Sequence, residues 1–205
     1  MKDKNIILVG AGGHAISCID VIELQHQFKI VGLVDLPSQK SVQKFSYPVF
    51  HNPSSLDDFV GKCKYAHIAV GQIKSSSRRS SLYKKALELG FEMPSIISPL
   101  AYVSPGAIIG LGTIIMHGAI INSGVRIGKN CIINSRALIE HGVVIGDHSH
   151  ISTGCILNGD VFIEDECFIG SGSCVKEGVK IERSSIVGMG LTVRYDLIEN
   201  SIFVG

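Results

Sequence analysis

Aliphatic side chains return at every sixth position along the second half of the chain. The series runs without exception from Val103 to Val193, which makes 16 consecutive positions in one phase. A six-residue period is typical of short parallel strands that are joined by tight turns and stacked into a β-helix. The pattern therefore predicts a prism in which each hexad forms one face and three hexads complete one coil.

The other positions of each hexad are ordered as well. Small or slender residues such as Ala119 and Cys131 stand four positions after an aliphatic residue, and glycines such as Gly112 and Gly142 stand three positions after one. We expect the aliphatic and small residues to point inward and to stack into ladders. The glycines would provide turn conformations that a residue with a Cβ atom resists.

The first half of the chain has a different pattern, in which apolar runs alternate with segments of helical spacing. It predicts strands at Asn5–Val9, Ile30–Val34 and His67–Val70, with helices at Ala15–Gln25 and Ser80–Leu89. This order implies a small open parallel sheet, too short for both halves of a dinucleotide-binding fold. We therefore predict an α/β half-Rossmann-like domain over residues 1–95 and a left-handed parallel β-helix over residues 96–205.

Composition narrows the classes of function. The net charge is +1, and no basic block or aromatic platform favours nucleic-acid binding. The first apolar run, Asn5–Val9, is too short for a signal peptide or a membrane span, so we expect a cytoplasmic protein. The six cysteines show no metal-ligand spacing. We interpret them as reduced, mostly buried thiols and expect no metal site.

A glycine-rich turn, Gly10–His14, follows the first predicted strand and precedes the first predicted helix. Glycines there let the backbone approach a phosphate, and a helix N-terminus favours an anion. Asp35 lies 21 residues after His14, where an acidic residue suits a ribose hydroxyl or a base edge. A turn without a ligand is the alternative interpretation. An oxidoreductase is disfavoured, because the domain is about half the size that such enzymes use.

The hexad pattern resembles that of the hexapeptide-repeat acyltransferases, which form left-handed β-helices and usually assemble as trimers. The whole chain is similar to the sialic acid O-acetyltransferase (NeuD) and bacillosamine-type amino-sugar N-acetyltransferase (PglD) family. The matching stretches are Ile6–His14, Ala69–Gly71, Ser95–Pro105 and Asn134–Ser152.

The resemblance implies a site for each substrate. A nucleotide-activated amino sugar would be held by Gly12, Gly13, His14, Asp35, Gly71 and Gln72. Acetyl-CoA, the acyl donor, would lie between subunits and contact His150, Gly159, Ser171 and Gly188. His141 matches the family's catalytic histidine and would act as the general base. The family commonly has an acidic residue directly after this histidine, whereas this chain has Gly142.

These features predict an acetyl-CoA-dependent N-acetyltransferase for bacterial surface glycan biosynthesis, acting by direct attack without an acyl-enzyme. O-acetylation of a sialic-acid-like sugar is one alternative, and a non-catalytic nucleotide-sugar-binding solenoid is another. His141 and His150 are nine residues apart, half of a coil, so they must project to different sides of one prism. If both histidines serve one reaction, they come from neighbouring subunits, which predicts a homotrimer.

Overall fold

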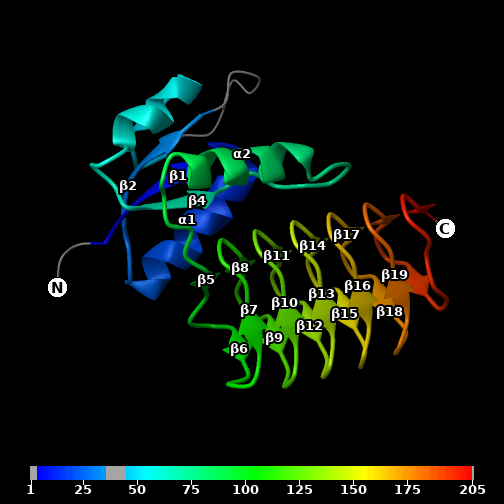
Figure 1. Cartoon of the computed structure of the whole chain (residues 1–205). Helices are drawn as coiled ribbons and strands as arrows, with labels where there is room; N and C mark the ends of the chain where they lie inside the picture. The colour runs from blue at the N-terminus through cyan, green and yellow to red at the C-terminus, as the bar shows by residue number, and fades with distance from the viewer. Residues whose placement is uncertain (1–3, 36–44, 205) are drawn as a thin grey trace.

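The computed structural model describes residues 4–35 and 45–204 (Figure 1). The N-terminal half holds β1 (Asn5–Val9), α1 (Gly13–Gln25), β2 (Lys29–Val34), β3 (Val49–Phe50), a 3-10 helix (Pro53–Phe59), β4 (Tyr65–Ile68) and α2 (Ser77–Glu88). The four strands form a parallel sheet in the order β3-β2-β1-β4. The continuous apolar run of β1 is buried because the strand lies inside the sheet.

Predicted boundaries in this half shift by one to three residues, most clearly at β4 and α2. Strand β4 begins and ends two residues before the predicted His67–Val70, because its pairing with β1 runs from Ile6 opposite Tyr65 to Val9 opposite Ile68. Helix α2 begins three residues before the predicted start at Ser80. Strands β1 and β4 consequently end side by side, and the loops that follow them leave the sheet at the same edge.

The second half is a β-helix of two-residue strands in three parallel sheets. The first sheet contains β5 (Ile96–Ile97), β8 (Ile114–Ile115), β11 (Ile132–Ile133), β14 (His150–Ile151), β17 (Phe168–Ile169), β20 (Ile186–Val187) and β22 (Ile202–Phe203). The second contains β6 (Tyr102–Val103), β9 (Ile120–Ile121), β12 (Leu138–Ile139), β15 (Ile156–Leu157), β18 (Cys174–Val175) and β21 (Thr192–Val193). The third contains β7 (Ile108–Ile109), β10 (Arg126–Ile127), β13 (Val144–Ile145), β16 (Phe162–Ile163) and β19 (Lys180–Ile181).

The strands pair with an offset of one coil, as in Leu138 opposite Ile156 and Ile139 opposite Leu157. The aliphatic residue of each hexad points inward, and all of these residues except the first two, Val103 and Ile109, are buried in one continuous core. Cys131, Cys155 and Cys167 occupy the small-residue positions of the same core. Burial raises the pKa of the Cys131 thiol to about 12 and that of Cys155 to about 11, so both stay protonated at neutral pH.

Close packing between coils depends on a second class of glycine, directly after the inward aliphatic residue. A Cβ atom on Gly110 would overlap the carbonyl group of Gly128 in the next coil and would lie 2.7 Å from the backbone nitrogen of Lys129. Backbone cannot yield as a flexible side chain can. These corners therefore need glycine for space, in addition to the turn glycines that the period revealed.

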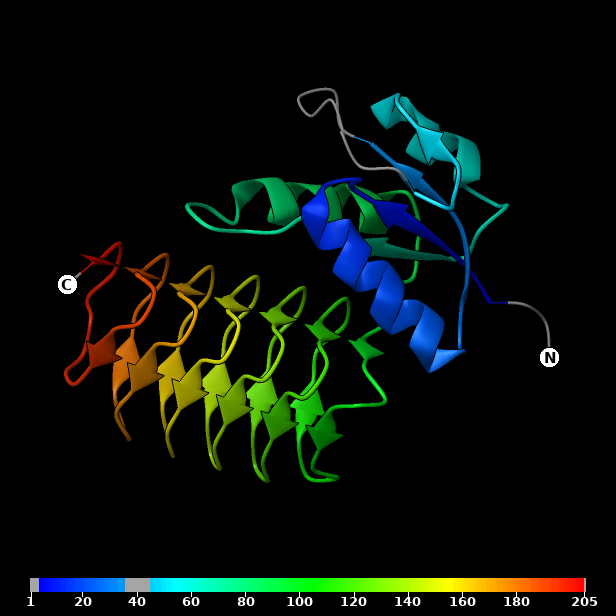
Figure 2. The same ribbon diagram turned by 180° about the vertical axis from the view of Figure 1, so that it is seen from behind.

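The α/β unit lies across the first sheet of the β-helix, with α1 between the two (Figure 2). Outward-facing residues of this sheet, among them Ile114 and Ile132, share a buried cluster with Ala15, Cys18 and Ile22 of α1. Along the described residues, no helix is long and apolar enough to cross a membrane. The interdomain packing fixes the carboxyl edge of the sheet against the strand that carries His150.

Candidate active site

The residues predicted to hold a nucleotide-sugar gather at the carboxyl edge of the parallel sheet. Gly12 and Gly13 follow β1, Asp35 follows β2, and Gly71 comes three residues after β4 ends. Gly12 is the N-cap of α1 and offers no side chain to the first turn, while Gly13 has open space where a Cβ atom would stand. The unpaired N–H groups of a helix N-terminus thus point towards a place that an anionic group can approach.

Asp35 is buried, and its carboxylate lies 3.4 Å from Nδ1 of the exposed His51. The backbone nitrogen of Asp35 also donates to the carbonyl oxygen of Phe50 at 2.8 Å, which ties the end of β2 to β3. Sequence reasoning missed His51. This exposed imidazole lies two residues before the 3-10 helix begins at Pro53, and it belongs to the surroundings of any group that Asp35 binds.

His14 lies in the first turn of α1 and packs against the loop that follows β4. Its Cβ atom is 3.5 Å from the position that a Cβ atom on Gly71 would occupy. Its Nε2 atom is buried and has no hydrogen-bond partner in the described parts of the chain. Burial is the main reason that the pKa of His14 falls to about 3, and the positive charge of Arg79 adds to this effect. His14 is therefore a neutral imidazole with one nitrogen available to a ligand.

Gln72 connects this edge to the β-helix. Nδ1 of the buried His150 donates to the backbone carbonyl of Gln72 at 2.8 Å, because a carbonyl oxygen only accepts. That hydrogen bond leaves Nε2 as the acceptor, and Asn134 donates to it at 3.3 Å. Burial lowers the pKa of His150 to about 4, so the ring is neutral. The structure thus places His150 at the contact between the two domains.

Arg79, which sequence reasoning missed, completes that contact. Its guanidinium is fully buried, donates to Gln72 Oε1 at 3.2 Å and donates to both the backbone carbonyl and the side-chain oxygen of Asn130. Burial lowers the pKa of Arg79 to about 10, so it stays charged at neutral pH. The only signal in the sequence was helical spacing: Arg79 stands four residues before Tyr83 and seven before Ala86, on the face of α2 that is buried.

His141 stands elsewhere, in the turn between β12 and β13, and its side chain is exposed. The ring lies against Gly159 of the next coil: a Cβ atom there would come within 2.6 Å of His141 Cε1 and 2.8 Å of Nε2. Neighbouring Glu140 accepts a hydrogen bond from Asn122 at 3.0 Å, and Asn134 is bound to His150. Neither side chain is therefore engaged in orienting His141.

Comparisons with known proteins bear on what this arrangement does. The PglD N-terminal domain family matches residues 5–86, the bacterial transferase hexapeptide family matches residues 124–159, and the succinyl-transferase hexapeptide repeat matches residues 160–194. No curated protein matches the sequence.

Several solved structures are similar over nearly the whole chain. Perosamine N-acetyltransferase (PerB) from Caulobacter crescentus, in complex with CoA and GDP-perosamine, is 29% identical, with 97% of this chain and 92% of that chain covered and a TM-score of 0.87. The acetyltransferase domain of PglB from Neisseria gonorrhoeae, in complex with acetyl coenzyme A, is 28% identical, with 95% and 93% covered and a TM-score of 0.85. WeeI from Acinetobacter baumannii is 25% identical, with 94% and 92% covered and a TM-score of 0.80.

The chain belongs to the hexapeptide-repeat sugar acetyltransferases of the PglD and NeuD type. This acetyltransferase has the predicted fold class, an α/β domain followed by a left-handed β-helix. It is an acyltransferase, and the described residues include no group of three His, Cys, Asp or Glu side chains that would hold a metal ion.

The residues predicted to contact acetyl-CoA in this acetyltransferase lie on two different edges of the prism. Gly159 is buried beneath the His141 ring, on the edge between the second and third sheets. Ser171 and Gly188 follow β17 and β20, on the edge next to the strand of His150. Ser171 Oγ lies 2.8 Å from Ser152 Oγ, and Gly188 packs against the backbone of Phe203. One protomer does not bring the two edges together.

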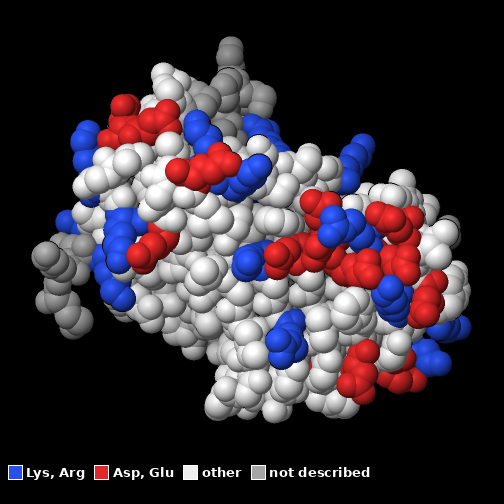
Figure 3. All heavy atoms as spheres, in the orientation of Figure 1, with Lys and Arg blue, Asp and Glu red and all other residues white. Residues whose placement is uncertain are grey.

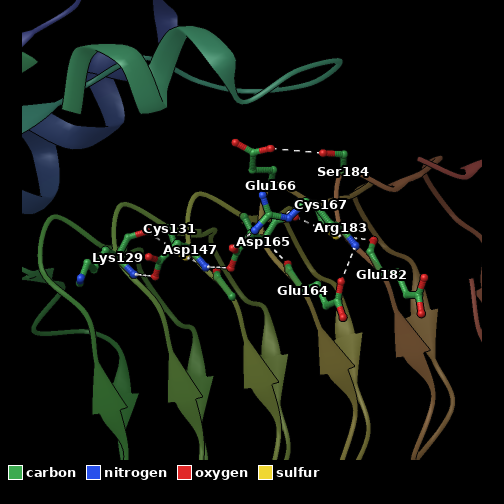
Figure 4. A network of polar contacts seen from close by, with 12 residues as sticks. Lys129, Cys131, Asp147, Glu164, Asp165, Glu166, Cys167, Glu182, Arg183 and Ser184 are labelled. Carbon is green, nitrogen blue, oxygen red and sulfur yellow. Dashed lines mark hydrogen bonds and ion pairs between the residues drawn. The ribbon is translucent and has the colours of Figure 1, made fainter. Parts of the chain in front are cut away.

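The remaining edge of the acetyltransferase prism is crowded with charge (Figure 3). Its carboxylates mostly accept hydrogen bonds from turn backbone in the previous or next coil, as Asp147 does from Lys129 N at 2.7 Å and Asp165 from Asp147 N at 2.8 Å (Figure 4). Arg183 also donates to Asp165 at 2.7 Å. These acidic residues hold the coils in register, and the predicted site residue Gln72 reaches this edge by donating to the backbone carbonyl of Glu166 at 3.4 Å.

Proposed function

We propose that this acetyltransferase moves the acetyl group of acetyl-CoA to the amine of a nucleotide-linked amino sugar, with His141 as the general base. The observation that carries the proposal is the placement of His141: an exposed imidazole, seated on Gly159, in an open turn of the β-helix. Imidazole suits proton transfer near neutral pH. The named ligands of PerB and PglB support the choice of both substrates.

The chemistry needs one base and no covalent enzyme intermediate. The amine nitrogen attacks the thioester carbonyl, a C–N bond forms, and His141 accepts the proton that the nitrogen loses. The C–S bond then breaks, and the CoA thiolate takes up that proton as it leaves. In the part of the chain that the structure describes, no cysteine contacts His141, and burial keeps Cys155 and Cys167 protonated by raising their pKa values to about 11 and 12.

A homotrimer is part of the proposal. Outward-facing apolar side chains flank the edge that bears His141: Tyr102, Ile120 and Ile156 are 56%, 42% and 38% exposed on the second sheet, and Ile108 and Phe162 are 53% and 40% exposed on the third. A second copy that covers these faces would bury them and would bring its own Ser171–Gly188 edge towards His141. Acetyl-CoA would then lie between subunits.

The nucleotide-sugar would occupy the carboxyl edge of the parallel sheet. The first turn of α1 at Gly12 and Gly13 would receive its phosphates, and Asp35 would meet the ribose or the base. His14 would face the sugar as a neutral donor or acceptor. Gly71 and Gln72 would close the site on the side of the β-helix.

The test is an acetyl-transfer assay with UDP-, GDP- and dTDP-linked amino sugars, in which released CoA thiol and acetylated product are both measured. Wild-type protein should turn over at least one of them, and His141→Ala should lower turnover on the order of 100-fold or more. Wild-type turnover by His141→Ala would refute the role of this residue.

The same assay separates the alternatives. Acetylation of a sialic-acid-like sugar hydroxyl, without any product from amines, would assign an O-acetyltransferase. A non-catalytic nucleotide-sugar-binding protein would show no thermal stabilisation by acetyl-CoA, because a ligand that binds the folded state raises its stability.

A further inference from the structure

His141 lacks a side-chain partner on its own coil. General bases of this type are usually oriented by a third group that also stabilises the imidazolium formed when the proton arrives. Within residues 4–35 and 45–204, no side chain forms a hydrogen bond with the His141 ring, and Glu140 is held by Asn122. A group that orients His141 is therefore sought on the neighbouring coils.

Asp160 is the carboxylate that the fold brings to this turn. It lies one coil after Gly142, and its backbone N–H donates to the carbonyl oxygen of His141 at 3.0 Å. Its backbone has φ 59°, the left-handed region that asparagine and aspartate tolerate. The side chain reaches back along the edge, so that a Cβ atom on Gly142 would overlap Asp160 Oδ1.

Gly142 and Asp160 are thus complementary. The carboxylate of Asp160 fills the space that a side chain of residue 142 would occupy, directly beside the residue that carries the imidazole. Gly142 itself has φ 70°, so the turn does not require a side chain there. Gly124, one coil before Gly142, and Gly178, one coil after Asp160, have no side chain at the same point.

We propose that Asp160 is the positioning residue for His141, and that Gly142 is glycine so that the Asp160 carboxylate can approach the imidazole. This inference depends on the proposed role of His141 as the base. Asp160 would hold the ring over Gly159 and stabilise the positive charge that His141 acquires with the proton of the amine.

The decisive variant is Asp160→Asn, which keeps the side-chain shape and tolerates the same backbone conformation. We expect its kcat to fall by up to about fivefold, the range for losing one attraction between exposed charges, while both KM values stay within about twofold. The acid limb of the pH–rate profile for kcat should move to lower pH, because the imidazolium has lost its neighbouring negative charge. Asp160→Glu should recover part of the rate.

Moving the carboxylate from position 160 to position 142 tests the geometry. Asp160→Gly should lose activity as Asp160→Asn does, and adding Gly142→Asp should restore most of the loss, since the new side chain enters the space that Asp160 left. Gly142→Ala should lower kcat by pushing the carboxylate away. Gly178→Ala is its matched control, with φ 71° and open space where the Cβ atom would stand.

Two results distinguish this inference from the proposed function. If Asp160→Asn keeps the wild-type kcat and pH profile while His141→Ala is inactive, Asp160 has no positioning role and the base assignment stands. If His141→Ala is fully active, the proposed mechanism fails first. Circular-dichroism melting of each variant would show that the β-helix remains folded.

Discussion

Acidification should destabilise this protein well above the pH at which carboxylates become protonated. His67 and His150 are 1% and 6% exposed, and burial lowers their pKa values to about 3 and about 4. In the unfolded chain each would titrate near 6.5. Below pH 6.5 the unfolded state therefore binds protons that the folded state does not bind. The free energy of unfolding that is present above pH 6.5 consequently decreases as the pH falls.

The magnitude follows from the linkage relation. Each such histidine removes about 1.4 kcal/mol of unfolding free energy per pH unit, so at pH 5 each should cost about 2 kcal/mol and the pair about 4 kcal/mol. His14, whose pKa also falls to about 3, adds a loss of the same sign. Urea unfolding at pH 7, 6 and 5 measures the change directly. A free energy of unfolding that stays constant from pH 7 to pH 5 would refute the reasoning.

His67→Leu isolates one of the two sites. Neither ring nitrogen of His67 has a hydrogen-bond partner among the residues that the structure describes, so an apolar side chain of similar size loses no hydrogen bond. The variant should be at least as stable as wild type at pH 7, and its loss at pH 5 should be smaller by about 2 kcal/mol. His26→Asn, at the exposed C-cap of α1, is the control and should leave the pH dependence unchanged.

Three further predictions follow from packing. Gly110→Ala should lower the melting temperature far more than Gly61→Ala: both residues lie in tight turns, but only the Cβ atom at 110 meets the backbone of the next coil. At Gly61, where φ is 77°, backbone strain of about 1 kcal/mol is the whole cost. Ile133→Ala, in the fully buried ladder, should lower the urea-unfolding free energy by about 2–5 kcal/mol. Arg79→Lys, which removes the planar fork that binds Gln72 and Asn130 together, should raise the KM for the nucleotide-sugar several-fold while leaving the KM for acetyl-CoA within about twofold.

The sequence predicted the β-helix well because its determinants are local and repeated. The inward position of every hexad is aliphatic, so a single phase places the strands from residue 102 to residue 193. The alternation of apolar runs and helical spacing predicted the turn at Gly12 between β1 and α1, whereas Gly71 was assigned by resemblance, and the ligand roles of both residues stay predictions. It misplaced β4 by two residues because strand ends depend on the pairing partner, here β1, which propensity does not encode.

Contacts between distant coils and between the domains could not be predicted in this way. Arg79 meets Asn130, 51 residues away, and Gln72 meets Glu166, 94 residues away. Such pairs depend on how α2 packs against the β-helix, and no short-range sequence pattern encodes that packing. The complementarity of Gly142 and Asp160 was hidden for a related reason: a missing side chain in one coil has meaning only beside the coil that follows it.

Because strands pair with an offset of 18 residues, the face on which a residue lies depends on its position within an 18-residue frame. Inserting one whole coil between Val144 and Phe162 would lengthen the prism by about 4.8 Å and leave every downstream residue on its own face. Inserting a single hexad would keep each aliphatic residue inside, yet turn everything beyond it by one face. Ser171 and Gly188 would then leave the edge beside His150, with the core intact. Length changes in multiples of six thus preserve the apolar core, but only multiples of 18 keep the outward-facing residues on their own edges of the prism.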